Sequence, residues 1–107
     1  MIFDIQISEQ ADKDLRGIYE YIAFELLSPE NALGQLNRLE TAINKLDHMP
    51  EKHHNYEREP WRGRGLRVFP VDNYLVFYIA DTKNKVVTVI RVMYSGRDVD
   101  KILSEDK

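Results

Sequence analysis

The sequence predicts an α+β domain of two layers, in which a helical hairpin packs against an antiparallel sheet. Two observations favour this fold class. Apolar residues recur at helical spacing in the first half of the chain, and three strand-sized apolar segments follow in the second half. The chain has 107 residues and contains no linker, repeat or low-complexity segment. We therefore expect one domain that spans residues 1–107.

The first half of the chain predicts a strand and two helices. Residues 3–7 alternate between apolar and polar, which is typical of a short half-buried strand. Ser8 is a favourable N-cap for the first helix, and Ser28-Pro29 separates that helix from a second one, which ends at Pro50. Because few residues join the helices, we expect an antiparallel hairpin. The predicted inner faces contain Ala11, Leu15, Ile18, Ile22 and Leu26, and then Ala32, Leu36, Leu39, Ile43 and Leu46.

The second half of the chain predicts a loop followed by a meander. Residues 50–64 show neither helical nor strand periodicity, so we predict a loop, with an extra helical turn at its start as an option. The predicted elements after the loop are strands at residues 66–71, 74–80 and 86–93 and a short helix at residues 98–103. Short connections make these strands antiparallel neighbours. We expect the helical hairpin to cover one face of the sheet and to leave the other face free.

Composition excludes several classes of protein. The chain has no cysteine, which excludes a disulfide framework and thiolate metal ligands and suits a reducing compartment. The longest apolar stretches are strand-sized, and the N-terminus has no signal-peptide pattern. We therefore expect a cytoplasmic protein that has no membrane partner. The sequence contains no P-loop, nucleophile-elbow or zinc-protease motif, and we expect no cofactor.

Charge is distributed unevenly along the chain, although the net charge is only −3. Residues 1–50 carry nine acidic and four basic side chains, whereas residues 52–97 carry four acidic and nine basic ones. A basic second half favours an anionic ligand or an acidic partner. Chance clustering on a solvated surface explains the same pattern equally well.

Four segments in order carry a resemblance to a known family. Ser8 is followed by an Ala11–Leu15 and Ile18–Ile22 pattern, and Pro29–Ala32 begins a segment that ends at Met49-Pro50. The most informative segments are Gly65–Tyr78, with Arg67 near its start, and Val89–Asp98, with Arg91, Tyr94 and Arg97-Asp98. In this order the chain resembles toxins of the RelE/ParE superfamily, from type II toxin–antitoxin systems. The resemblance covers nearly the whole chain.

This resemblance implies a fold like that of microbial ribonucleases and a growth-inhibiting toxin. RelE-like members are mRNA interferases, endoribonucleases that cut mRNA in the ribosome. ParE-like members inhibit DNA gyrase and lack the nuclease residues. In both groups a cognate antitoxin silences the toxin. The resemblance therefore implies a toxin that inhibits growth by cleaving ribosome-bound mRNA. The alternatives are a non-catalytic toxin that binds DNA gyrase and a toxin fold that has lost its activity.

Three residues are candidates for catalysis of RNA cleavage. The reaction needs a base near the ribose 2′-OH, cations around the phosphorane and an acid for the leaving oxygen. Arg67 and Arg91 are the candidate cations, and we expect them to share the sheet face away from the helices. The alternative is a structural ion pair with a carboxylate. Tyr94 is the candidate that orients the sugar or base, but it stands where such toxins often have a histidine, and a tyrosine is a poor base.

A second group of candidates surrounds the irregular loop. Candidates for RNA or partner binding are Lys52, His54, Arg58, Trp61, Arg62, Arg64 and Arg97. Trp61 between basic residues suits base stacking or a protein partner, or else it closes the core beneath the loop. Asp98 is a candidate N-cap. His53, His54 and Glu57 offer too few ligands for a metal, so we expect none.

The antitoxin is expected to meet the basic second half of the chain. Three docking places are open: the exposed sheet face, the loop at residues 52–64, and the groove beside the helical hairpin. A disordered antitoxin segment would fold as it binds and add a strand at a sheet edge.

Overall fold

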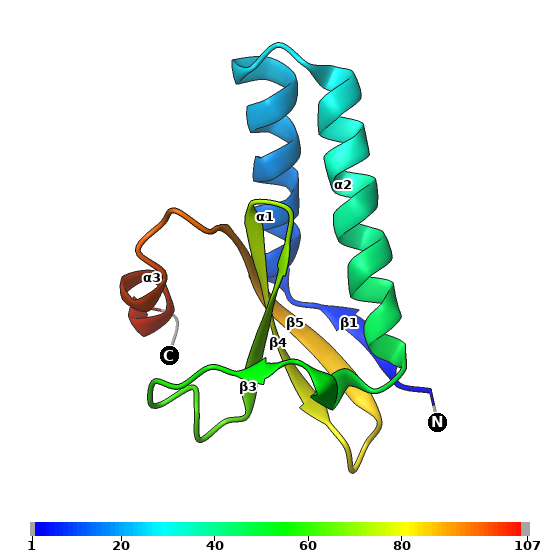
Figure 1. Cartoon of the computed structure of the whole chain (residues 1–107), viewed down its shortest axis with the longest axis vertical. Coiled ribbons are helices and arrows are strands. Elements are labelled where there is room, and N and C mark those ends of the chain that lie inside the picture. The colour runs from blue at the N-terminus through cyan, green and yellow to red at the C-terminus, as the bar shows by residue number, and fades with distance from the viewer. Residues whose placement is uncertain (1, 106–107) are drawn as a thin grey trace.

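A computed structural model describes residues 2–105 and confirms the predicted α+β class (Figure 1). A strand, a helical hairpin, an antiparallel meander and a C-terminal helix follow one another in the predicted order. The elements are β1 (Asp4–Ile7), α1 (Glu9–Glu20), a π-helix (Tyr21–Glu25), α2 (Pro29–Asn44), 3-10 turns (Lys45–Asp47 and Pro50–Lys52), β2 (His54–Asn55), β3 (Leu66–Val71), β4 (Tyr74–Asp81), β5 (Val86–Tyr94) and α3 (Val99–Glu105).

The five strands form one sheet in the order β1-β5-β4-β3-β2. β1 runs parallel to β5, with Asp4 opposite Val86 and Ile7 opposite Val89, so the first strand of the chain pairs with the last. The other neighbours are antiparallel. β2 was not predicted, because two residues are too few to show strand periodicity.

The helical hairpin packs on the sheet with its lower half only. α1, α2 and this face of the sheet enclose a core that contains Leu15, Leu39, Ile43, Val76 and Tyr78. Figure 1 shows the upper half of the hairpin extending beyond the sheet. There the two helices rest on a separate cluster, whose buried members are Ile22, Ala23 and Ala32. The small alanines allow the helices to approach closely. This end of the hairpin is therefore supported by its own packing.

The expectation that the second sheet face is free is wrong. Trp61, Leu66, Phe77, Met93 and Leu103 form a second buried cluster on that face. The loop before β3 and helix α3 cover it, and the indole Nε1 of Trp61 donates a hydrogen bond to the carbonyl oxygen of Leu103 at 2.9 Å. The physical reason lies in β4, which is apolar on both faces, as strands buried from both sides are.

No helix among residues 2–105 is long and apolar enough to cross a membrane.

The second cluster predicts a large stability cost for a loop mutation. Trp61→Ala should lower the free energy of unfolding by about 3–5 kcal/mol, because it empties a buried aromatic site. Its neighbour Arg62 is exposed, so Arg62→Ala should change stability by less than about 0.5 kcal/mol. Urea denaturation followed by circular dichroism measures both variants. A small loss for Trp61→Ala would mean that this loop does not close a core.

Candidate functional site

One edge of β5 pairs with β1 and then, where β1 ends, contacts the start of α1. β1 pairs with β5 only as far as Val89. Beyond it, the Ser8 backbone N–H donates to Val89 O at 3.0 Å and the Ser8 hydroxyl donates to Ile90 O at 2.9 Å. The Ser8 oxygen also accepts from Ala11 N, which is the predicted N-cap. The start of α1 is therefore fixed to the sheet edge by one serine.

Asp14, one and a half turns further along α1, continues this contact. Its carboxylate accepts a hydrogen bond from the Val92 backbone N–H at 2.9 Å. The same carboxylate receives Arg91 Nε at 2.8 Å and Arg91 Nη2 at 3.0 Å, a bidentate pair. The Arg91 and Asp14 side chains are only 9% and 10% exposed. Arg91 thus takes the structural ion pair that the sequence left as the alternative to a phosphate contact.

Arg67 lies elsewhere on the sheet. β4 separates β3 from β5, so the strands that carry Arg67 and Arg91 are not adjacent. Arg67 stands opposite Tyr78, whose ring is in the core beneath the hairpin. Its Nη1 donates to His53 O at 2.7 Å. The expectation that both arginines project from the face away from the helices is therefore wrong. The second core fills that face, and each arginine has a partner on the hairpin side.

Tyr94 ends β5 and is 52% exposed. Its ring meets the ring of Tyr74 edge to face, with 6.0 Å between centroids. Tyr94 is opposite Tyr74, and Arg67 is opposite Tyr78, so the two lie four positions apart along β4. At the usual rise per residue this is about 13 Å. The structure does not bring Tyr94, Arg67 and Arg91 together as one site.

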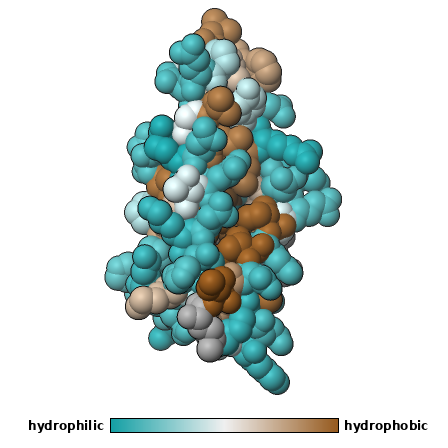
Figure 2. All heavy atoms as spheres, turned by 90° about the vertical axis from the view of Figure 1, so that its right-hand side faces the viewer, coloured by the Kyte–Doolittle hydropathy of each residue, from teal (hydrophilic) through white to brown (hydrophobic). Residues whose placement is uncertain are grey.

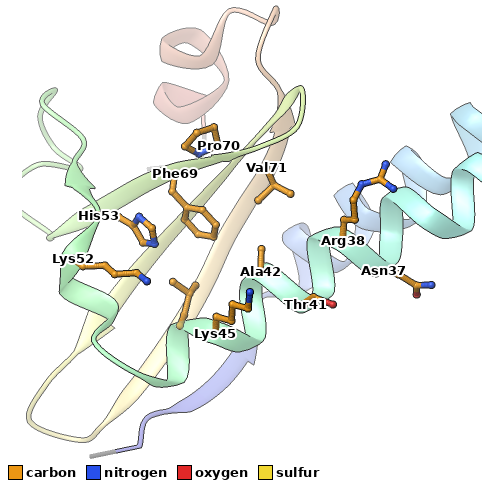
Figure 3. Close-up of a pocket in the computed structure, with 11 residues that line it drawn as sticks. Asn37, Arg38, Thr41, Ala42, Lys45, Lys52, His53, Phe69, Pro70 and Val71 are labelled. Atoms are coloured by element: carbon orange, nitrogen blue, oxygen red, sulfur yellow. The ribbon is translucent and has the colours of Figure 1, made fainter.

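A groove of about 470 Å³ lies between α2 and β3 (Figure 3). The side chains that line it are Asn37, Arg38, Thr41, Ala42, Lys45, Leu46, Lys52, His53, Phe69, Pro70 and Val71. Its floor is apolar and its rim is basic. Lys52 was predicted as a binding residue, whereas Arg38 and Lys45 were missed. Their spacing of seven residues on a predicted helix was the available signal.

His53 is the titratable group inside this groove. Its ring stacks on Phe69, with centroids 4.4 Å apart and planes 15° apart, and it meets the Tyr78 ring edge on. Burial, and then the charge of Lys52, lower the pKa of His53 from its ordinary value. Burial raises the pKa of Tyr78 to about 12, and the Tyr78 hydroxyl donates to Pro50 O. Both rings are therefore neutral at pH 7. Arg38 is paired with Asp72 at 2.7 Å, so the positive charge of the groove comes from Lys45 and Lys52.

The remaining predicted binding residues are spread over the surface. Arg58 is paired with Asp100 of α3 at 3.0 Å, and the guanidinium of Arg64 lies 4.9 Å from the centre of the Trp61 ring. Arg62, Arg97 and His54 are exposed, His54 in the edge strand β2. Asp98 Oδ1 accepts from Lys101 N at 3.3 Å, so it caps α3. Trp61 is buried and closes the second core, which was one of its predicted alternatives.

In the part of the chain that the structure describes, no three His, Asp or Glu side chains gather as a metal site would require.

Removing one partner of the Asp14–Arg91 ion pair should destabilise the fold strongly. Asp14→Ala deprives a buried guanidinium and the Val92 N–H of a shared acceptor, so we expect a loss of about 3–5 kcal/mol in the free energy of unfolding. Asp12→Ala is the matched control on the same helix. Its ion pair with Arg16 is exposed and should contribute less than about 1 kcal/mol. Equal losses in urea denaturation would contradict a structural role for Asp14.

The sequence and the fold were compared with those of known proteins. Residues 5–99 match the family described as "ParE toxin of type II toxin-antitoxin system, parDE". The fold is similar to that of a chain from the chromosomal ParDE toxin–antitoxin system of P. aeruginosa, with a TM-score of 0.70 and 18% identity over 87% of this chain and 96% of that chain. No curated protein sequence matches.

Two solved toxin–antitoxin complexes contain similar chains. One is the RelBE2 complex from Mycobacterium tuberculosis, with a TM-score of 0.61 and 18% identity over 88% of this chain and 99% of that chain. The other is the archaeal RelE–RelB complex from Pyrococcus horikoshii OT3, with a TM-score of 0.62 and 20% identity over 91% and 99%. At these identities the likeness concerns the fold alone.

Proposed function

This chain belongs to the ParE toxin family of type II toxin–antitoxin systems, and we propose that it arrests growth by binding DNA gyrase rather than by cutting mRNA. The single observation that carries the choice is the buried, bidentate Asp14–Arg91 pair. A cation that stabilises a phosphorane has to reach the phosphate, and Arg91 is 7% exposed. An inhibitor that binds a protein needs no such cation.

The distribution of the other candidates supports the same choice. RNA cleavage needs cations, a base and an acid within hydrogen-bond reach of one phosphodiester. Arg67 and Tyr94 are separated along β4, and a tyrosine is a poor base at pH 7. The groove at Lys52 and His53 supplies cations and a neutral imidazole, which is the observation that favours the mRNA interferase alternative.

Assays of purified toxin on gyrase and on programmed ribosomes distinguish the two functions. We expect inhibition of supercoiling by the gyrase holoenzyme and no new cut in mRNA on programmed ribosomes. Tyr94→Phe removes only an exposed hydroxyl, so it should change growth inhibition less than about twofold. Cleavage of ribosome-bound mRNA by wild-type toxin, lost in Tyr94→Phe, would establish the nuclease instead. Inhibition of neither target, together with no arrest of growth, would point to a fold that has lost activity.

We also propose that the cognate antitoxin occupies the groove between α2 and β3. Lys45 and Lys52 at its rim would attract an acidic segment, and the apolar floor would hold it. β2 pairs only with Arg67 and Val68, so residues 69–71 of β3 border the groove with an edge that β2 does not cover. An antitoxin strand can add there, although Pro70 offers no donor. The second core removes the exposed sheet as a docking place.

Association kinetics with the antitoxin test this assignment. The Lys45→Ala/Lys52→Ala double variant should bind more slowly, and its on-rate should depend less on salt, because steering charges have been removed. The control removes the same charge elsewhere: Arg62→Ala/Arg64→Ala should leave both quantities near wild type. If the control slows association and the lysine variant does not, the antitoxin meets the surface around Arg62 and Arg64 rather than the groove.

A further inference from the structure

The far end of the helical hairpin presents large apolar side chains to solvent. Tyr21 is 54% exposed, Phe24 67%, Leu26 55%, Leu27 81% and Leu33 54%. These five residues, here called the hairpin tip, belong to the π-helix, the connection and the first turns of α2. Figure 2 shows hydrophobic residues gathered at the top of the molecule, where Figure 1 places the end of the hairpin. Exposed apolar groups in one patch usually mark a binding surface.

The fold itself does not need these side chains. The two helices are joined near the tip by the separate cluster of Ile22, Ala23 and Ala32, from which the tip residues are absent. Its packing partners Ile18 and Tyr19 also lie further down α1. Polar residues at the tip positions would leave this cluster intact. Stability therefore gives no reason for leucine and phenylalanine at the tip.

The backbone at the tip is also unusual. Residues 21–25 form a π-helix, in which Leu26 N donates to Tyr21 O at 3.0 Å. π-helical turns are rare and occur often at functional sites. Leu27 has a φ of +53° at the end of this helix, where Ser28 N donates to Ile22 O at 3.0 Å. A left-handed residue is common at this cap position, but glycine or asparagine usually occupies it. A leucine that is 81% exposed at this position costs stability relative to glycine or asparagine, which is consistent with a binding role.

Charge shows what kind of partner fits the tip. From Gly17 to Asn37 the sequence contains Glu20, Glu25 and Glu30 and no lysine or arginine. All three glutamates are exposed. The tip is thus an apolar surface with an acidic surround, the opposite of the basic groove at the other end of α2. Acidic surroundings repel nucleic acid, and they repel a second copy of the same tip.

We propose that the hairpin tip is the surface with which the toxin contacts its protein target, inserting into an apolar pocket that is rimmed by lysine and arginine. This inference rests on the proposed function as a binding toxin and names the part of the molecule that binds. Aromatic side chains such as Tyr21 and Phe24 are typical of the residues that dominate binding energy at protein interfaces.

The test uses substitutions that do not touch the supporting cluster. Leu27→Asn places a residue that tolerates a positive φ, so the variant should be at least as stable as wild type. Combined with Phe24→Gln it removes the two most exposed tip side chains. We expect its affinity for the gyrase holoenzyme to fall about thirtyfold, as for truncation of a dominant interface residue, with growth inhibition lost. Its affinity for the antitoxin, which we place in the groove, should stay near that of wild type.

Met49→Gln is the matched control, because Met49 also has a positive φ of +50° and is 75% exposed, but follows α2 and the 3-10 turn at Lys45–Asp47. It should bind gyrase and arrest growth as wild type does. A second variant, Glu25→Lys/Glu30→Lys, keeps the apolar tip and reverses its surroundings. Its association with gyrase should be slower, and added salt should slow it less than it slows wild type.

Different results contradict the role of the tip and the proposed function. A tip variant that inhibits gyrase and growth as wild type does overturns the tip and leaves gyrase as the target. If wild-type toxin does not inhibit gyrase, the proposed function fails, and growth inhibition by the same variants then decides whether the tip contacts another protein. Sedimentation that shows a wild-type dimer and a monomeric tip variant would assign the surface to self-association and overturn the proposal. Ribosomal mRNA cleavage that the tip variant retains would also overturn it.

Discussion

The carboxylate of Asp14 holds a backbone amide and a bidentate guanidinium at the point where β1 stops pairing with β5. Without it, the continuation of β5 would present an unpaired amide to an apolar interior. With it, α1 is fixed to the sheet at both Ser8 and Asp14, and this attachment sets the direction in which the hairpin leaves the sheet. The position of the groove and the projection of the tip both depend on that direction, since α2 packs on α1.

Local patterns in the sequence predicted most of the fold. Helical periodicity gave the hairpin, short connections gave the meander, and Ser8 was recognised as an N-cap, because each of these signals lies within a few neighbouring residues. The second core escaped prediction because periodicity does not reveal that a continuous apolar run such as β4 is covered on both faces. The functional site was harder to predict from the sequence than the fold. Arg91 is paired with a carboxylate 77 positions away, and nothing local distinguishes that arginine from one that faces a phosphate.

Two surfaces of opposite charge lie at the two ends of α2. Lys45 and Lys52 line the groove with its apolar floor, whereas the exposed apolar side chains of the tip have the exposed Glu20, Glu25 and Glu30 as sequence neighbours. A net charge of −3 conceals this division. Because charge of one sign attracts partners of the other sign and repels its own, the same small domain can discriminate between an acidic and a basic protein surface. A toxin that has to recognise both a target and an inhibitor benefits from such separation.

A shared fold leaves the chemistry to individual residues. An arginine near the end of β5 can serve a phosphate only if its guanidinium reaches solvent. One carboxylate on α1, at the turn that crosses β5, is enough to draw it into the protein instead. The energetic argument favours the paired state, because a buried guanidinium without a carboxylate partner is strongly disfavoured. The arginine of β5 and the facing residue of α1 therefore determine the mechanism together. Both belong to the helix–sheet contact on which the architecture depends.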